Sequence, residues 1–329
     1  MNRRSSICGF LFYRSTDVID ARLALRKESK HRSLVRITDE TVCGGKDLFI
    51  IGGPCSVESF AQMQEVAYKL STAPVQALRG GVFKPRTSPY AFQGLGADGL
   101  SILKEIKKSS GLPVVSEVMS EEQVELMASY ADVLQVGSRN MQNFELLKAL
   151  GKVKLPVLLK RGLSATLEEF ILAAEYLLSH GNDNVILCER GIRSFDKYTR
   201  NVLDLAAVVA LRQITHLPVV VDPSHATGRR ELIADLARAA VACGADGLMI
   251  ECHPQPDVSV SDAQQAISLD DMVAIVDSLR PIALAVGRRV KVTKQALIDS
   301  NIDSQPNRYP SNQIDQPFAS ANRGWAGGR

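Results

Sequence analysis

The stretch LFIIGGPCSVESFAQMQEVAYKL, residues 48–70, combines two patterns that decide the fold class. Its first part, LFIIG (48–52), is a short run of apolar residues, and ESFAQMQEVAYKL has the apolar spacing of an amphipathic helix. A strand that is apolar on both faces and is followed by a helix is typical of a parallel sheet, because crossover helices cover both of its sides. The stretch therefore predicts one β/α unit.

The same pairing of an apolar run with an amphipathic stretch recurs along the middle of the chain. Eight such units in about 240 residues match the size of a closed (β/α)8 barrel, the TIM barrel, and we predict this α/β fold. An open, doubly wound parallel sheet is the structural alternative. The eight runs occupy residues 48–52, 75–83, 113–118, 132–137, 155–160, 184–190, 217–222 and 246–251.

The two ends of the chain lack this rhythm. We expect a single catalytic barrel over residues 47–287, preceded by a short N-terminal extension, residues 1–46. Within the extension, SLVRI (33–37) has the pattern of a strand. Residues 288–329 become polar and are predicted to form a mobile C-terminal tail.

Composition excludes several classes of protein. The 329 residues are 45% hydrophobic and 23% charged, as in globular domains, and the net charge of +3 is too small for a general nucleic-acid binder. No apolar run approaches the roughly 18 to 20 residues that a membrane span needs. Six cysteines without regular spacing fit a reducing compartment, so we expect a cytoplasmic protein without membrane or nucleic-acid partners.

Ionisable residues stand at or just beyond the end of every predicted strand, where the active sites of TIM barrels lie. Any one of them alone would be read as a solvated loop charge. Together, cations at the ends of apolar strands are costly to desolvate unless they converge on an anion, so the ring predicts a site for phosphate and carboxylate groups. Its members are Cys55, Glu58, Arg79, Lys84, Arg86, Glu117, Arg139, Lys160, Arg190, Asp222, His225 and Glu251.

The loop FKPRTSPY (83–90) could be a basic linker or a rigid anion-binding loop. Pro85 and Pro89 restrict φ on both sides of Arg86 and Thr87. Such restriction favours a preorganised anion loop.

A second set combines one thiol, one imidazole and two carboxylates, namely Cys55, His225, Glu251 and Asp262. This mixture suits a divalent transition metal and leaves Mn, Fe, Co and Zn open. Because there is no local motif such as CxxC, a buried cysteine near a capping histidine is an equal alternative. Cys252 follows Glu251 at a strand end and should point to the other side of the sheet.

Seven motifs, in order along residues 33–287, closely resemble the 3-deoxy-D-arabino-heptulosonate 7-phosphate (DAHP) synthases of type I, in their short microbial subtype. They are GPCSVES (53–59), LRGGVFKPRTSPYAFQGLG (78–96), VGSRNMQN (136–143), LLKRG (158–162), CERG (188–191), VDPSHATG (221–228) and IECHP (250–254). The resemblance implies a metal-dependent, aldol-like condensation of phosphoenolpyruvate with erythrose 4-phosphate and water. This reaction releases phosphate and opens the shikimate pathway of aromatic amino acid biosynthesis.

The same resemblance implies roles for individual residues. The family's metal ligands fall on Cys55, His225, Glu251 and Asp262, although Ala263 stands where the family commonly has glycine. Its phosphoenolpyruvate-binding cations fall on Arg79, Lys84, Arg139, Lys160 and Arg190, and we add Asp222 to the substrate site. Its erythrose 4-phosphate loop falls on Lys84, Pro85, Arg86, Thr87 and Ser88.

For catalysis, we expect Lys84 to protonate the developing alkoxide and either His225 or Glu117 to handle the water proton. The resemblance also implies a homo-oligomer, a tetramer or a dimer. Residues 1–46 are too few for the regulatory N-terminal domains of some relatives, so we expect no feedback inhibition through such a domain.

Three other functions are alternatives. The 3-deoxy-D-manno-octulosonate 8-phosphate synthases take arabinose 5-phosphate and typically read KANRSS where this chain reads KPRTS (84–88), and the sialic-acid synthases are more remote. Metal-independent 3-deoxy-D-manno-octulosonate 8-phosphate synthases have asparagine at the position of Cys55, so Cys55 favours metal dependence here. A non-catalytic barrel that senses phosphorylated metabolites would not need four metal ligands.

Overall fold

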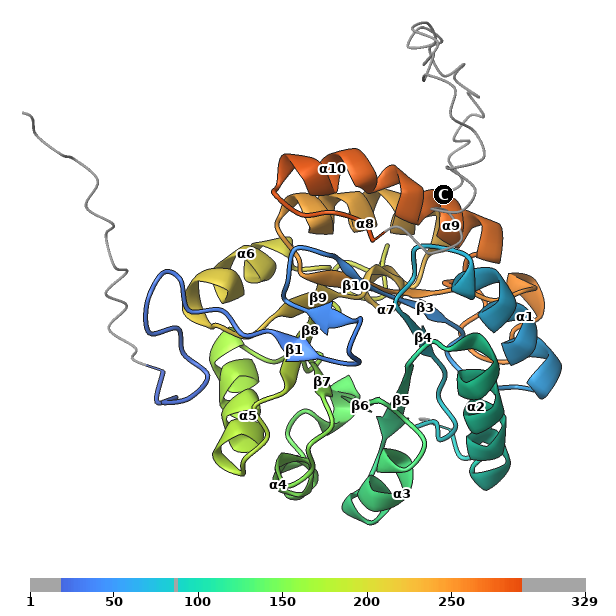
Figure 1. Ribbon diagram of the computed structural model, residues 1–329, viewed down its shortest axis with the longest axis horizontal. Coiled ribbons are helices and arrows are strands. Elements are labelled where there is room, and N and C mark those ends of the chain that lie inside the picture. Colours follow the sequence, from blue (N-terminus) through green and yellow to red (C-terminus); the bar gives the residue numbers. More distant parts are fainter. Residues whose placement is uncertain (1–18, 86–87, 292–329) are drawn as a thin grey trace, which may run out of the picture. The chain divides into compact units, whose positions relative to one another are not determined.

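In a computed structural model, which describes residues 19–85 and 88–291, eight parallel strands close into a barrel. Helices surround the strands (Figure 1), which confirms the predicted TIM barrel and excludes the open sheet. In chain order the strands are β3 (Phe49–Gly53), β4 (Ala77–Arg79), β5 (Val114–Val118), β6 (Val133–Val136), β7 (Val157–Lys160), β8 (Val185–Glu189), β9 (Val219–Val221) and β10 (Gly247–Glu251).

Each of the eight predicted apolar runs coincides with one barrel strand, and only β3 extends past its run, by one residue to Gly53. The run 75–83 is longer than β4, since the chain leaves the regular strand at Gly80 and Gly81. β10 pairs with β3 from Gly247 opposite Phe49 to Glu251 opposite Gly53, and this pairing closes the barrel. The carboxyl ends of all eight strands therefore meet at one rim.

Several helices begin where their sequences supply a capping side chain. The Ser59 side chain accepts a hydrogen bond from the Gln62 amide at the start of α1, and Thr166 and Glu169 form a capping box on α5. The helices are α1 (Phe60–Ser71), α2 (Ala97–Ser110), α3 (Val124–Ala128), α4 (Phe144–Gly151), α5 (Leu167–Ser179), α6 (Leu205–Ile214), α7 (Pro223–Thr227), α8 (Ile233–Ala242), α9 (Leu269–Ser278) and α10 (Arg280–Ala285). Short 3-10 turns are η1 (Glu121–Gln123), η2 (Ser138–Asn140), η3 (Arg230–Leu232) and η4 (Pro256–Val258).

The predicted strand in SLVRI is β1 (Val35–Arg36), and it pairs antiparallel with β2 (Val42–Cys43). Val35 and Cys43 are fully buried and pack with the side chains that fill the barrel interior, such as Phe49 and Met249. The hairpin therefore covers the amino-terminal end of the barrel (Figure 1), which leaves the carboxyl end for the site.

The end of the described chain also contacts the amino-terminal end of the barrel. The backbone of Arg289 pairs with Asp47, and the Arg288 guanidinium donates to the Gly45 carbonyl. The rest of the predicted tail lies outside the described residues, as do residues 1–18 of the extension. Within residues 19–85 and 88–291, no helix has the length and apolar character that crossing a membrane requires.

Candidate active site

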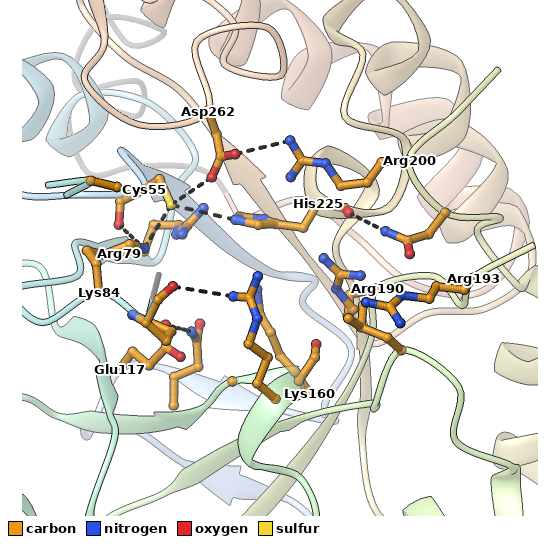
Figure 2. A pocket seen from close by; sticks show the side chains of 18 residues that line it. Cys55, Arg79, Lys84, Glu117, Lys160, Arg190, Arg193, Arg200, His225 and Asp262 are labelled. Atoms are coloured by element: carbon orange, nitrogen blue, oxygen red, sulfur yellow. Dashed lines mark hydrogen bonds and ion pairs between the residues drawn. The ribbon is translucent and has the colours of Figure 1, made fainter. Parts of the chain in front are cut away.

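A cavity of about 480 Å³ lies at the carboxyl rim of the barrel (Figure 2). The β strands and the loops that follow them supply its walls, as the ring of strand-end residues predicts. The lining residues that the argument uses are Cys55, Arg79, Lys84, Pro85, Glu117, Gln135, Gly137, Arg139, Lys160, Arg190, Arg193, Arg200, Asn201, His225 and Asp262.

Positive charge dominates this cavity. Seven of the lining residues are Lys or Arg, whereas two are carboxylates. Nη1 of Arg79 and Nη1 of Arg190 are buried, and neither has a hydrogen-bond partner among the described residues. Because a buried guanidinium donor without a hydrogen bond is costly, these atoms suit a site for an anionic ligand.

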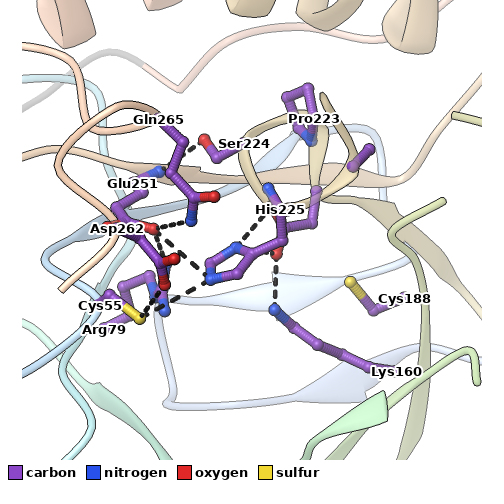
Figure 3. A network of polar contacts seen from close by, with 12 residues as sticks. Cys55, Arg79, Lys160, Cys188, Pro223, Ser224, His225, Glu251, Asp262 and Gln265 are labelled. Carbon is purple, nitrogen blue, oxygen red and sulfur yellow. Dashed lines mark hydrogen bonds and ion pairs between the residues drawn. The ribbon is translucent and has the colours of Figure 1, made fainter. Parts of the chain in front are cut away.

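The four candidate metal ligands do converge (Figure 3). One ligand atom from each of Cys55, His225, Glu251 and Asp262 can be chosen so that all four lie within 4.8 Å of one another. His225 Nε2 lies 3.8 Å from Cys55 Sγ and 3.4 Å from Glu251 Oε2. Segments that are distant in sequence bring these donors together, so the Cys55 thiol lies among three other donors and not beside His225 alone.

Asp222 sets the orientation of the His225 ring. Its carboxylate lies 2.8 Å from His225 Nδ1 and 2.5 Å from Lys160 Nζ, and it also accepts from the His225 amide. Because Asp222 accepts the Nδ1 proton, the Nε2 lone pair faces the ligand cluster, an arrangement found behind metal-binding histidines. Burial, followed by the charges of Lys160 and Arg79, lowers the pKa of His225 to about 3 against the opposing effect of Asp222, so the ring is neutral.

Glu251 is buried in the cluster, and its negative charge is only partly compensated. Burial raises its pKa to about 7 despite Arg79, whose Nη1 lies 3.6 Å away. Its Oε1 is buried, and no donor from the described part of the chain reaches it. A soft thiolate, a neutral imidazole and two carboxylates around such an oxygen fit a divalent transition metal.

Lys84 joins the ligand cluster to the anion-binding side of the cavity. Its Nζ lies 2.9 Å from Cys55 Sγ and 3.0 Å from the Cys55 carbonyl oxygen. Although burial opposes it, the neighbouring Cys55 raises the pKa of Lys84, with a smaller contribution from Glu117. The amine is therefore protonated at neutral pH and can donate a proton.

Asp262 adopts a backbone conformation that is uncommon for a residue other than glycine, with φ at 56°. Its Oδ1 accepts a hydrogen bond of 3.1 Å from Arg200, and its Oδ2 lies 3.5 Å from Cys55 Sγ. Although burial opposes it, the nearby His225 ring, the Arg200 guanidinium and hydrogen bonds from Arg200 and Cys55 lower the pKa of Asp262 to about 2. Asp262 is therefore ionised and aimed at the cluster.

Glu117 lies in the cavity beside the backbone of Gly137. Gln135 donates to its Oε2 over 3.4 Å, and a Cβ atom at position 137 would lie 2.0 Å from its Oε1. The absence of a side chain at Gly137 thus makes room for the carboxylate.

We expect Gly137→Ala to cost about 1–3 kcal/mol of stability, because overpacking at a buried site forces displacement of the Glu117 side chain. Chemical denaturation measures this cost. In a Glu117→Ala background the clash is removed, so the same substitution should cost much less. An equal loss of stability in the wild-type and Glu117→Ala backgrounds would show that the clash with Glu117 is not its cause.

The other residues of the predicted site divide into three groups. Asp222 is fully buried behind His225 and does not line the cavity. Arg139 lies at the rim, where its Nη1 is 3.4 Å from the Pro85 carbonyl, and Ser88 is exposed. Arg86 and Thr87 lie outside the described residues.

Several residues of the site were not singled out from the sequence. Arg193, Arg200 and Asn201 come from the loop after β8, which folds back so that Ile192 and Val202 pair. Asn201 donates to the His225 carbonyl over 3.3 Å. The cation-rich stretch RGIRSFDKYTRN (190–201) was the available signal.

A buried ion pair stabilises the start of the loop that follows β8. Arg161 Nη1 lies 2.9 Å from Glu189 Oε2, and the other oxygen of Glu189 accepts from the Gly191 amide. Arg161 belongs to the LLKRG motif, but no local sequence pattern links it to Glu189. The pair fixes the backbone on either side of Arg190.

Comparison with known proteins agrees with this geometry. The sequence model of the DAHP synthetase I family matches residues 28–281. A phospho-2-dehydro-3-deoxyheptonate aldolase from Thermotoga maritima is 49% identical over 241 residues, which span 73% of this chain and 71% of that protein. A 2-dehydro-3-deoxyphosphooctonate aldolase from Geotalea daltonii is more distant, at 35% identity over 73% of this chain and 93% of its own.

Solved structures give the same result. The crystal structure of the Thermotoga maritima DAHP synthase superimposes with a TM-score of 0.80 at 44% identity, covering 83% of this chain and 79% of that chain. A truncated form of that enzyme gives a TM-score of 0.76 at 42% identity, covering 82% of this chain and 98% of its own. The closed barrel, the cation-lined cavity and these matches lead to one conclusion: the chain belongs to the DAHP synthetase I family.

Proposed function

We propose that this protein condenses phosphoenolpyruvate with erythrose 4-phosphate and water to give DAHP and inorganic phosphate. One observation carries the proposal. In this chain, a member of the family, a four-donor ligand cluster and a cavity with seven cations lie at the same barrel rim. The cluster suits a divalent metal, and the cations suit two phosphates and one carboxylate.

The metal would be held by Cys55, His225, Glu251 and Asp262, and Mn, Fe, Co and Zn all remain compatible with these donors. When bound, it supplies Lewis acidity that makes the aldehyde carbon of the acceptor sugar more electrophilic.

The cations of the cavity bind and orient phosphoenolpyruvate. We assign Arg79, Lys84, Arg139, Lys160 and Arg190 to its phosphate and carboxylate. The buried Nη1 atoms of Arg79 and Arg190 have no hydrogen-bond partner among the described residues, and they support this assignment, since a bound anion would satisfy both. Asp222 contributes indirectly, because it fixes Lys160 and His225.

The acceptor sugar phosphate is assigned to the loop that begins with Lys84 and Pro85 and continues through Arg86, Thr87 and Ser88. Pro85 lines the cavity, and the exposed Ser88 lies on the solvent side of the loop. C3 of phosphoenolpyruvate attacks the aldehyde carbon, and water adds at C2 before the bond between C2 and the phosphate oxygen breaks.

Two protons move in this reaction, and residues of the cavity are placed to handle them. Lys84, protonated beside Cys55, donates to the alkoxide that forms on the aldehyde oxygen. Glu117 lies in the same cavity near Gln135 and is one candidate for accepting the proton of water, and His225 is the other. Because Asp222 and the ligand cluster engage both nitrogens of His225, the geometry favours Glu117.

Product identity tests the proposal. Incubation with phosphoenolpyruvate and erythrose 4-phosphate should give a seven-carbon sugar acid phosphate that mass spectrometry identifies. An eight-carbon product from arabinose 5-phosphate alone would instead assign the protein to the rival condensation. As a family member whose five described cysteines are free, the protein is proposed to work in the cytoplasm as a homo-oligomer.

Arg200→Ala is expected to weaken metal binding by about 10–100-fold, because the guanidinium holds the Asp262 carboxylate toward the cluster. Chelator competition in the absence of substrate measures this affinity directly. Arg193→Ala is the matched control, since it removes a cation from the same loop and cavity. If both variants bind metal with the wild-type affinity, the prediction is wrong and Arg200 acts only in substrate binding.

A further inference from the structure

At the amino-terminal end of the barrel, away from the active-site cavity, four arginines gather around one carboxylate. Arg212 lies in the last turn of α6, Asp246 directly precedes β10, and Arg288 follows α10. Arg26 and Arg32 come from the segment before β1. We call Arg26, Arg32, Arg212 and Arg288 the basal arginine cluster.

Backbone contacts bring the segment that carries Arg26 and Arg32 against α6 and β9. The Arg26 amide donates to the Ile214 carbonyl over 2.8 Å, and Arg26 Nη1 donates to the Arg212 carbonyl over 2.9 Å. The Ser33 amide donates to the His216 carbonyl over 2.8 Å. Residues 26–33 therefore run alongside residues 212–216, with their cations on the same side of the molecule.

Two members of the cluster are satisfied by the protein. Arg26 donates to the Glu28, Ser29 and Arg212 carbonyls, and Arg288 donates to the Gly45 carbonyl and to the Asp246 carboxylate. The second oxygen of Asp246 already accepts from the Val219 amide over 2.8 Å. This carboxylate is therefore committed to Arg288 and the backbone.

The other two members are only partly satisfied. Arg212 Nη1 donates to the Cys243 carbonyl over 3.5 Å, and Asp246, whose charge acts on both arginines, is bound by Arg288. Nη1 of Arg32 and Nε of Arg212 are buried, and no acceptor within residues 19–85 and 88–291 bonds to either. Burial, followed by the charges of Arg26 and Arg212, lowers the pKa of Arg32. Burial likewise lowers the pKa of Arg212, where Asp246 opposes and Arg288 adds to the effect. Unpaired buried donors among like charges are unfavourable without a bound anion.

We propose that the basal arginine cluster binds an oxyanion of the phosphate type, held between Arg32 and Arg212. Guanidinium groups suit phosphate because their planar donors match its oxygens. None of the four arginines lines the active-site cavity, so this site would be separate from the one that binds substrate. Inorganic phosphate and the phosphate of a monoester present the same chemistry to it.

An anion at this position would link parts of the chain that are far apart in sequence. Arg32 belongs to the segment before β1, whereas Arg212 belongs to α6. Binding would therefore stabilise the attachment of residues 26–33 to the barrel, and it would raise the stability of the whole fold by mass action.

Thermal unfolding in phosphate and in chloride, at matched ionic strength, tests the proposal. Arg32→Met removes the charge and the unpaired donors but keeps an apolar side chain of similar reach. Arg36→Met is the matched control, because Arg36 lies in β1, directly after this segment, is mostly exposed and faces Asp39 at 3.8 Å. Each protein is also measured in an Arg190→Met background, which weakens phosphate binding in the active-site cavity.

With inorganic phosphate ten times above its dissociation constant, Tm should rise by about 3 °C in the wild type and in Arg36→Met. Most of this rise should be lost in Arg32→Met, and the loss should persist in the Arg190→Met background. In chloride, Arg32→Met should be as stable as the wild type or more stable, because it removes repulsion. Arg32→Lys keeps the positive charge but lacks the planar guanidinium donors, so it should retain part of the phosphate-dependent rise in Tm.

An equal phosphate effect in Arg32→Met and the wild type would overturn the proposal. So would an Arg32→Met variant that is destabilised equally in both salts, because Arg32 would then serve packing alone. Glycerol 3-phosphate in place of inorganic phosphate distinguishes the sources: an Arg32-dependent rise with it assigns monoesters to the site, and a rise with inorganic phosphate alone assigns the free anion. Neither result bears on the proposed condensation.

Discussion

Cys55→Ala should lower kcat by about 10³-fold or more and should eliminate the thiolate-to-metal absorption of the cobalt-loaded protein. The thiol is one of four donors within 4.8 Å, and its removal leaves His225 and two carboxylates around a buried space. Lewis acidity contributes several kcal/mol to such a reaction, and each 1.36 kcal/mol is about tenfold in rate.

The matched control is Cys43→Ala, a second fully buried cysteine at the other end of the barrel. This variant should keep its activity and its cobalt spectrum. Cobalt binding is measured before any activity assay, which separates loss of metal from loss of fold. A Cys55→Ala protein that turns over at the wild-type rate after metal removal would contradict the metal-dependent account.

Lys84→Met should lower kcat by about 10²–10⁴-fold, the range that general acid catalysis contributes. The Lys84 amine is buried beside Cys55 and protonated, and methionine keeps its reach without the proton. Lys84→Arg should not restore the rate, because a guanidinium does not give up its proton near neutral pH.

Lys104→Met, on the exposed face of α2, serves as the control and should behave as the wild type. Because Lys84 is also assigned to phosphoenolpyruvate binding, steady-state kinetics must separate the two roles. A fall in kcat that exceeds the rise in KM supports proton transfer. A higher KM with an unchanged kcat would leave Lys84 a binding residue only.

The barrel could be predicted from sequence because its signal is local. Each apolar run and each amphipathic stretch, such as 48–52 and 58–70, can be recognised within its own window of residues. The strand ends then follow, and with them the positions of Arg79, Lys160 and Arg190. Of the hairpin that covers the amino-terminal end, only β1 could be predicted. β2 consists of two residues, Val42 and Cys43, and has no strand periodicity.

The finer structure of the site depends on contacts between loops, which no local pattern encodes. The hydrogen bond from Arg200 to Asp262 joins residues 62 positions apart, and it depends on the loop after β8 folding back. Asp222 was identified as a strand-end residue, but its support of both Lys160 and His225 required three-dimensional placement. The positive φ of Asp262 likewise has no signature in the sequence VSDAQQ.

The most direct test is phosphate release from phosphoenolpyruvate with erythrose 4-phosphate or arabinose 5-phosphate, with EDTA and then with added Mn. The account predicts release with the four-carbon sugar alone, its loss with EDTA and its return with Mn. Release with the five-carbon sugar alone, or release that EDTA leaves unchanged, would contradict it.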